Sequence, residues 1–133
     1  MRLTGRPEQT AYARWGGEAF FTALIERFYE GVATDPLLRP LYPDDLTESQ
    51  AHLALFLMQY WGGPRGYSDQ RGHPRLRMRH APFPIGQSAR DRWVQLMDRA
   101  LDEAAFPDDV QQLLREFFAA MATFMMNRTD PAS

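Results

Sequence analysis

Apolar side chains recur at helical spacing in several long segments of this chain, and no segment shows sustained alternation of apolar and polar residues. The spacing predicts amphipathic helices over residues 18–33, from Thr47 to about Tyr60, from about Ser88 to Ala104, and from Pro107 onwards. The expected apolar stripe of the last helix is Val110, Leu113, Leu114, Phe117, Met121, Phe124 and Met125. We therefore predict an all-α protein with four substantial helices.

Residues that favour helix ends divide these segments. Gly16-Gly17 permits a sharp turn after a short first helix, and Asp35-Pro36 has the N-cap and first-turn residues of a new helical turn. Residues 47–50, TESQ, have the form of a capping box, and Ser88 with Asp91 is expected to cap the helix that follows. Residues 62–72 are expected to form a long loop before a short helical turn over 75–81.

The composition indicates one domain and excludes several kinds of site. With 133 residues, 44% of them hydrophobic, the chain is expected to form a single domain (1–133) in which 1–11 are a flexible N-terminal extension. There is no Cys, which excludes disulfides, thiolate nucleophiles and covalent haem attachment, and no Lys, which excludes a Schiff base. The net charge of −2 gives no reason to expect nucleic acid as a partner. No apolar run is long enough for a membrane span or a secretory signal, so we expect a cytoplasmic protein.

His80 is the first candidate for a functional residue. It ends the short turn that follows the Pro/Gly-rich run beginning at Trp61, and Arg75, Arg77 and Arg79 precede it. A single histidine near a helix end is often only structural. A neutral imidazole is also a good axial ligand for haem iron, and guanidinium groups pair with carboxylates such as haem propionates.

Tyr29, Tyr42 and Trp93 are bulky residues with a polar tip. Each of them, taken singly, is more often a core residue with one local hydrogen-bond partner. Alternatively, all three donors converge on one buried polar ligand.

The chain resembles the truncated haemoglobins of group II. The resemblance rests on FYEGVATDPLLRPLYP, on LFLMQYWGGPRGYSDQRGHPRLRMRHAPF and on DRWVQLM, and it extends over about residues 12–127. It implies a two-over-two helical sandwich around non-covalent haem b. It also implies that His80 is the proximal ligand of a pentacoordinate iron, and that Tyr29, Tyr42 and Trp93 form a distal hydrogen-bonding cage.

The same resemblance implies roles for the other residues expected near haem. Leu53 is implied as an apolar wall, Arg79 as a propionate partner and Tyr67 as a weaker one; Phe56, Met78 and Phe83 are expected to line the haem. His52 and His73 match no ligand position.

The function implied is binding of O2 and other diatomic ligands, with O2, CO, NO or peroxide as the small molecules. We expect redox or detoxification chemistry with an external reductase, with peroxidase-like or NO dioxygenase-like turnover left open. The alternatives are an O2 store or carrier, a gas sensor and, from another class, a haem-free helical interaction module. The oligomeric state is open, with a homodimer as one option.

Overall fold

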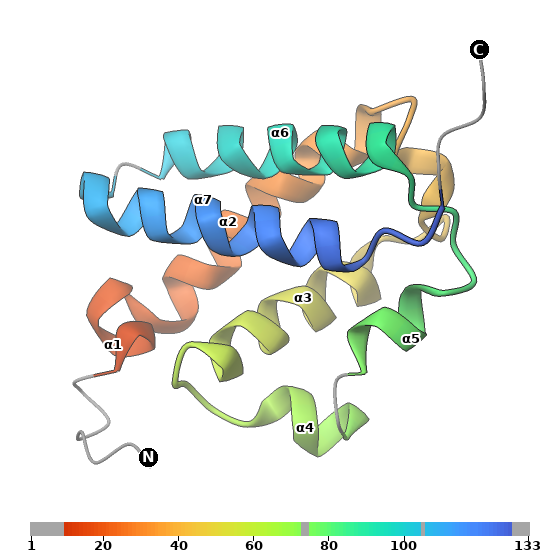
Figure 1. Ribbon diagram of the computed structural model, residues 1–133. Coiled ribbons are helices and arrows are strands. Elements are labelled where there is room, and N and C mark those ends of the chain that lie inside the picture. The colour runs from red at the N-terminus through yellow and green to blue at the C-terminus, as the bar shows by residue number, and fades with distance from the viewer. Residues whose placement is uncertain (1–9, 73–74, 105, 129–133) are drawn as a thin grey trace. The chain divides into compact units, whose positions relative to one another are not determined.

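The computed structural model describes residues 10–72, 75–104 and 106–128, and within these ranges the secondary structure is helical, without a strand (Figure 1). The elements are α1 (Ala11–Trp15), α2 (Gly17–Thr34), the 3-10 turn η2 (Arg39–Leu41), α3 (Thr47–Tyr60), α4 (Gly66–Arg71), α5 (Leu76–His80), α6 (Gln87–Glu103) and α7 (Asp108–Phe124). The all-α prediction and its four long helices are confirmed. Among the helices described, none combines the length and apolar character that a bilayer span requires.

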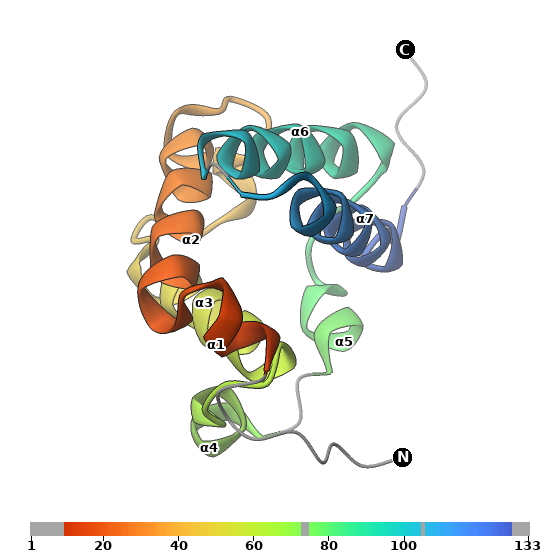
Figure 2. The ribbon, with the colours of Figure 1, turned by 90° about the vertical axis from the view of Figure 1, so that its left-hand side faces the viewer.

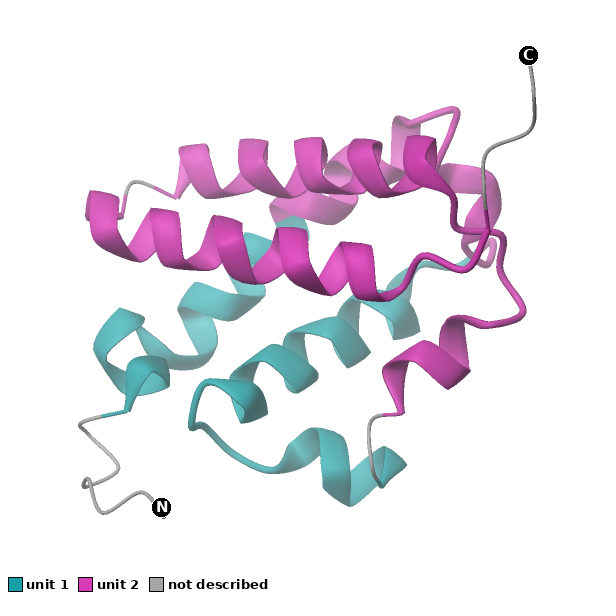
Figure 3. Cartoon of the chain, viewed as in Figure 1, with its two compact units in different colours: residues 1–26, 45–74 teal, residues 27–44, 75–133 magenta. Residues whose placement is uncertain are grey.

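The chain forms two compact units (Figure 3). The first unit comprises residues 1–26 and 45–74, and the second comprises residues 27–44 and 75–133, so that the boundary falls inside α2. Each unit has its own buried apolar residues. The most deeply buried are Phe21, Leu24, Ile25 and Leu57 in the first unit, and Phe28, Val32, Leu38, Met97, Leu101 and Leu114 in the second.

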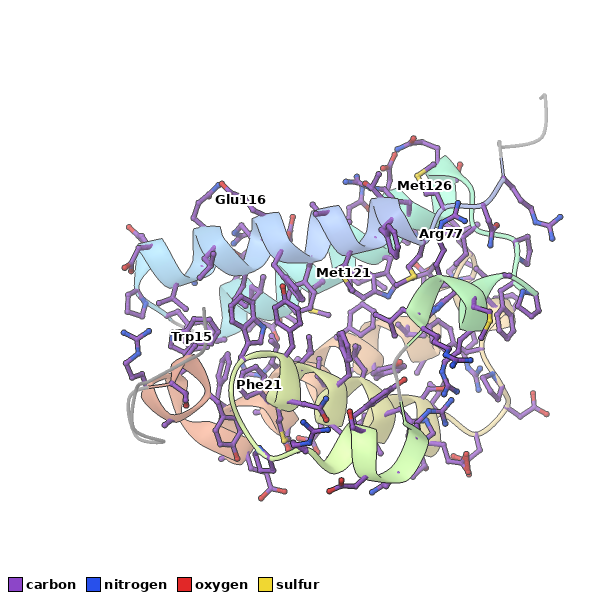
Figure 4. All side chains as sticks on the ribbon, turned by 60° about the horizontal axis from the view of Figure 1, so that its bottom comes forward. Trp15, Phe21, Arg77, Glu116, Met121 and Met126 are labelled. Atoms are coloured by element: carbon purple, nitrogen blue, oxygen red, sulfur yellow. The ribbon has the colours of Figure 1, made fainter. Side chains whose placement is uncertain are left out.

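In the first unit, α1 packs at the end of α3. Thr10 caps α1 by accepting a hydrogen bond from the Ala13 amide at 3.1 Å, and the Tyr12 amide donates to the Trp61 carbonyl at 2.8 Å. A Cβ on Gly63 would lie 2.6 Å from Cδ1 of Tyr12, so only glycine permits this approach. Trp15 also packs near Phe21, with ring centroids 6.3 Å apart (Figure 4). The expected extension over residues 1–11 was wrong for its last two residues, since Thr10 caps α1 and Ala11 begins it, and residues 1–9 lie outside the described ranges.

The expected loop over residues 62–72 contains a helix, α4, which the sequence analysis missed. Gln59 on α3 binds it twice: its side-chain amide donates to Oγ of Ser68 at 2.7 Å, and its oxygen accepts from the Ser68 amide at 2.9 Å. Tyr67 is buried against Phe56, with ring centroids 5.5 Å apart. A six-residue helix with one apolar anchor has no periodicity to detect, and its stability comes from packing against α3.

In the second unit, α6 and α7 pack side by side, as two views at right angles show (Figures 1 and 2). The buried line of α7 is Leu114, Phe118 and Ala122, and it continues to Met125, the residue after the helix. The predicted stripe was therefore partly wrong, since Leu113 and Phe124 are 45% and 55% exposed. Two apolar stripes lie next to each other on this helix, and periodicity alone does not tell which one is buried.

Two predicted helix caps were wrong. Thr47 is the first residue of α3 rather than its cap, and Asp45 accepts the Thr47 amide at 2.9 Å. The N-cap position of α6 is Gly86, so Ser88 lies inside the first turn, and Asp91 accepts the Gln87 side chain at 2.7 Å instead of capping the helix. In each case the helix begins one or two residues away from the position that the pattern indicates, which is the usual uncertainty at helix ends.

Candidate functional site

The second unit brings Tyr29, Tyr42 and Trp93 together. The Tyr42 hydroxyl accepts hydrogen bonds from the Trp93 side chain and from the Tyr29 hydroxyl. The Tyr29 and Tyr42 rings meet edge to face, with centroids 5.7 Å apart and an interplanar angle of 82°. We call these three residues the Tyr29–Tyr42–Trp93 cluster. They come from α2, from the connection after η2, and from α6.

Aromatic packing holds the cluster against the core of the second unit. Phe28 precedes Tyr29 on α2, and its ring centroid lies 4.9 Å from that of Trp93. Phe118 on α7 approaches the other side of Trp93 at 5.8 Å. Because Phe28 and Phe118 are almost completely buried, the Trp93 indole has little freedom to turn.

Burial perturbs both phenols of the cluster. It raises the pKa of Tyr29, and the neighbouring Tyr42 raises it further, through charge repulsion and because Tyr29 donates its proton to Tyr42. Burial also raises the pKa of Tyr42, while the hydrogen bonds that Tyr42 accepts from Trp93 and Tyr29 work in the opposite direction. Both hydroxyls therefore stay protonated at neutral pH.

A buried carboxylate supports the segment that carries Tyr42. Asp35 follows α2 and is 7% exposed. Its Oδ2 accepts the amides of Leu37 and Leu38 at 3.1 and 2.8 Å, and its Oδ1 accepts a hydrogen bond from Arg92 on α6. Asp35 thus accepts the amides two and three residues on, as an N-cap does, but it is not the N-cap of η2, which begins at Arg39 with Leu38 in the N-cap position. Its ion pair with Arg92 was not predicted, because the two residues lie 57 positions apart.

His80 is the last residue of α5 and is half-buried. Its Nδ1 lies 2.7 Å from the Leu76 carbonyl oxygen one turn earlier. A carbonyl oxygen only accepts, so Nδ1 carries the proton and Nε2 has the free lone pair. This is the tautomer that a histidine needs in order to bind a metal ion through Nε2.

Two side chains fasten α5 to the end of α7 in the second unit. Arg77 donates to the carbonyl oxygens of Phe124 at 3.1 Å and Met126 at 3.2 Å, and the labelled Arg77 and Met126 lie close together in Figure 4. The Asn127 side-chain amide donates to the carbonyls of His80 at 3.2 Å and Phe83 at 2.9 Å. Its oxygen accepts the Ile85 amide at 3.0 Å. A helix as short as α5 is not stable alone, so these bonds decide where it lies.

The other predicted site residues are divided between the units. Arg79, Met78 and Phe83 lie on or just after α5 in the second unit; Arg79 is half-buried, while Met78 and Phe83 expose 60% and 43% of their surface. Leu53, Phe56 and Tyr67 belong to the first unit, on α3 and α4. Leu53 is half-buried, and the other two are buried. Their contacts with a cofactor stay predictions.

The remaining histidines were expected to have no ligand role. The ring nitrogens of His52 lie 3.1 and 3.2 Å from the Arg71 guanidinium. His73 lies outside the described residues.

Sequence reasoning missed several residues that hold the candidate site in place. They are polar residues of types that are common on protein surfaces: Arg92, Arg77 and Asn127. Their partners are distant in the chain or are backbone carbonyls, so no sequence pattern indicates them. The one signal was their position. Arg92 directly precedes Trp93, and Arg77 lies three residues before His80.

Comparison with known proteins gives this arrangement its context. The family model for bacterial-like globins matches residues 10–127. The chain belongs to this family. It is a truncated haemoglobin of group II, since it is 40% identical over 114 residues to the Group 2 truncated hemoglobin YjbI of Bacillus subtilis, which covers 86% of either chain.

Solved haemoglobin structures agree with the fold. The thermostable hemoglobin of the actinobacterium Thermobifida fusca is 53% identical, with a TM-score of 0.89 over 92% of this chain and 100% of that one. A truncated oxygen-avid haemoglobin from Bacillus subtilis is 37% identical, with a TM-score of 0.82 over 92% of this chain and 100% of that one. This truncated globin is therefore a haem protein that binds gaseous ligands, with haem b as its cofactor. Its family decides against the alternative of a haem-free interaction module.

The side chains of the second unit fit haem b. His80 offers an imidazole with a free Nε2 lone pair, and Arg79 beside it is a cation suited to a propionate. Met78 and Phe83 present apolar surface on the same short segment. The hydrogen-bond donors of the Tyr29–Tyr42–Trp93 cluster belong to other elements of this unit.

Proposed function

We propose that His80 holds the haem iron through Nε2, and that the Tyr29–Tyr42–Trp93 cluster stabilises diatomic ligands bound there. When bound, haem supplies the iron centre at which O2, CO, NO or peroxide binds. The protein's own contribution is to fix the imidazole on one side and to present hydrogen-bond donors on the other. Arg79 pairs with a propionate in this proposal, and Met78 and Phe83 pack against the macrocycle.

The observation that carries the proposal is the hydrogen bonding at Tyr42. A phenol hydroxyl has one donor and two acceptor positions. Tyr42 accepts from both Trp93 and Tyr29. In this proposal its own proton is donated to the bound ligand. Two accepted hydrogen bonds also polarise the hydroxyl and make it a stronger donor.

The strength of such a contact indicates slow ligand release. A hydrogen bond to a charged acceptor contributes about 1.5–3 kcal/mol, which corresponds to a change in release rate of roughly ten-fold to a hundred-fold. Preorganised donors keep this strength because they need no reorganisation when negative charge develops on the ligand.

Slow release suits chemistry on the ligand better than bulk O2 delivery. We therefore assign redox or detoxification of O2, NO or peroxide, supported by an external reductase, as the function. The Bacillus subtilis haemoglobin is oxygen-avid, and this supports slow O2 release as the premise of the proposal.

Substitution of the cluster tests its role. We expect Tyr42→Phe and Trp93→Phe to speed O2 dissociation by roughly ten-fold to a hundred-fold in stopped-flow displacement by CO. Trp15→Phe is the matched control: it makes the same chemical change on α1, where Trp15 packs against Phe21 and Trp61, and its rate should equal that of the wild type. Unchanged rates in both cluster variants would remove the cluster from ligand binding.

Replacement of His80 tests its proposed role as the iron ligand. His80→Gly should lose stable haem incorporation, and added imidazole should restore a five-coordinate ferrous spectrum by occupying the place of the side chain. Retention of a normal spectrum without imidazole would refute the assignment of His80.

A further inference from the structure

Asp35 contacts each of the three elements that carry the Tyr29–Tyr42–Trp93 cluster. Its backbone continues from α2, where its amide donates to the Val32 carbonyl at 3.1 Å. Its Oδ2 accepts two amides at the start of the connection that leads to Tyr42. Its Oδ1 pairs with Arg92, the residue next to Trp93 on α6. One buried carboxylate thus joins α2, the connection and α6.

Arg39 holds the far end of the same connection. Its guanidinium donates to the carbonyl oxygens of Pro43 at 2.8 Å and Asp44 at 2.6 Å, on the far side of Tyr42. Its backbone carbonyl accepts the Tyr42 amide at 3.2 Å, and its own amide donates to the Asp35 carbonyl at 2.9 Å. The segment from 35 to 44 is therefore fastened at both ends, although its only regular structure is the short turn η2.

The charge on Asp35 strengthens the hydrogen bonds that hold this segment. A carboxylate that accepts two amides and one guanidinium holds all of them within short range, because charge-assisted hydrogen bonds are shorter and stronger than neutral ones. Leu38, whose amide is one of the two, is itself buried, so the turn cannot be displaced without exposing an apolar side chain. The separation of Tyr42 from Trp93 is thus linked to the Asp35–Arg92 pair.

We propose that Asp35 and Arg92 are positioning residues that set the hydrogen bond between Trp93 and Tyr42, and through it the rate of ligand release. The part that concerns ligand release rests on the function proposed above. The part that concerns the Trp93–Tyr42 hydrogen bond does not.

The test uses Arg92→Leu, because Arg92 is 40% exposed and the two amide hydrogen bonds of Asp35 Oδ2 do not involve it. In 15N-labelled CO-bound holoprotein, the Trp93 indole N–H resonance should shift, since this proton donates to Tyr42. O2 dissociation should speed up by roughly three-fold to ten-fold, less than for removal of a donor, because the donor is displaced and not deleted. Arg92→Lys, which keeps a positive charge near Asp35, should recover part of both effects.

A double-mutant cycle separates positioning from general destabilisation. In the Tyr42→Phe background, Arg92→Leu should change the O2 rate by less than about two-fold, because its effect passes through Tyr42. Arg115→Leu is the matched control: Arg115 on α7 pairs with Asp98 and Asp102 on α6, so its loss also breaks an ion pair of this unit. It should lower the melting temperature without moving the indole resonance or the O2 rate.

Each outcome has one meaning. An unmoved indole resonance in Arg92→Leu, or the same rate change with and without Tyr42, would overturn the positioning role while Tyr42→Phe still reports on the cluster. A shifted resonance together with unchanged O2 rates in Tyr42→Phe, Trp93→Phe and Arg92→Leu would overturn the proposed function. It would still support the positioning of Trp93.

Discussion

Asn127 offers a measurable link between the end of α7 and haem retention. Its side chain makes three hydrogen bonds, to the carbonyls of His80 and Phe83 and from the amide of Ile85. Asn127→Ala removes all three and leaves the short helix α5 attached mainly through Arg77. The variant should lose haem faster, because the proposed iron ligand then stands on a less restrained element.

The magnitude follows from the number of bonds. A hydrogen bond of this kind contributes about 1 kcal/mol net, and Asn127 is half-buried, so the loss is about 2 kcal/mol in all. If this loss reaches the bound haem in full, the rate of haem dissociation rises by roughly thirty-fold; if half of it does, by roughly five-fold. We expect a value within that interval.

Haem transfer from the ferric protein to an excess of a haem-free acceptor globin measures this rate. Asn127→Asp is the informative companion variant, because it keeps the acceptor for the Ile85 amide but turns a carboxylate oxygen toward two carbonyls. It should lose haem at least as fast as Asn127→Ala. The control is Gln112→Ala, which breaks an exposed hydrogen bond to Glu116 on the same helix. Equal rates in Asn127→Ala and wild type would refute the idea that this contact restrains α5.

Three further predictions concern stability. Tyr42→Phe should destabilise the ferric protein by about 1–2 kcal/mol more than Tyr29→Phe in urea unfolding, because only Tyr42→Phe deprives two donors of their acceptor. At Asp35, burial works against ionisation, but the amide of Leu38 and the Arg92 side chain overcome it and hold the carboxyl pKa below its usual value. The ionised carboxylate therefore contributes its full stabilisation above about pH 4–5, and this contribution is lost as the pH falls through the lowered pKa of the folded protein. Over this acid range, Asp35→Asn should lose less stability than the wild type in urea unfolding. Gly63→Ala should lower the free energy of unfolding by about 2 kcal/mol or more in thermal melts, since its Cβ would lie 2.9 Å from the Met58 carbonyl oxygen. Gly72→Ala, with nothing within 4 Å of its Cβ, should cost only the strain of a backbone conformation that favours glycine, about 1–3 kcal/mol.

The long helices were accessible from sequence because each depends on residues close to one another in the chain. Apolar spacing identified α2, α3, α6 and α7. Local chemistry also identified the turn at Asp35, where the carboxylate binds amides two and three residues away. The individual caps of α3 and α6 were wrong because several polar residues near each start can take the role, and the exact start of a helix depends on its packing.

The candidate residues divide in the same way. Motifs within short segments pointed to His80, Tyr29, Tyr42 and Trp93, and through the family to haem b. Their roles stay proposals. The hydrogen bonds of Tyr42 came only from the structure, since its two donors lie 13 residues before it and 51 after it in the chain.

The sequence by itself determined the helix content, the family and the cofactor, because these depend on residue type and on local spacing. Only the tertiary structure decided which stripe of α7 is buried, that α4 exists, and that Asp35, Arg92, Arg77 and Asn127 fasten the elements around the candidate site. The buried stripe of α7 and the existence of α4 depend on which neighbours pack against them. The polar side chains join groups that are far apart in the chain or backbone carbonyls, and such a side chain shows its partner only when folding has brought the two together.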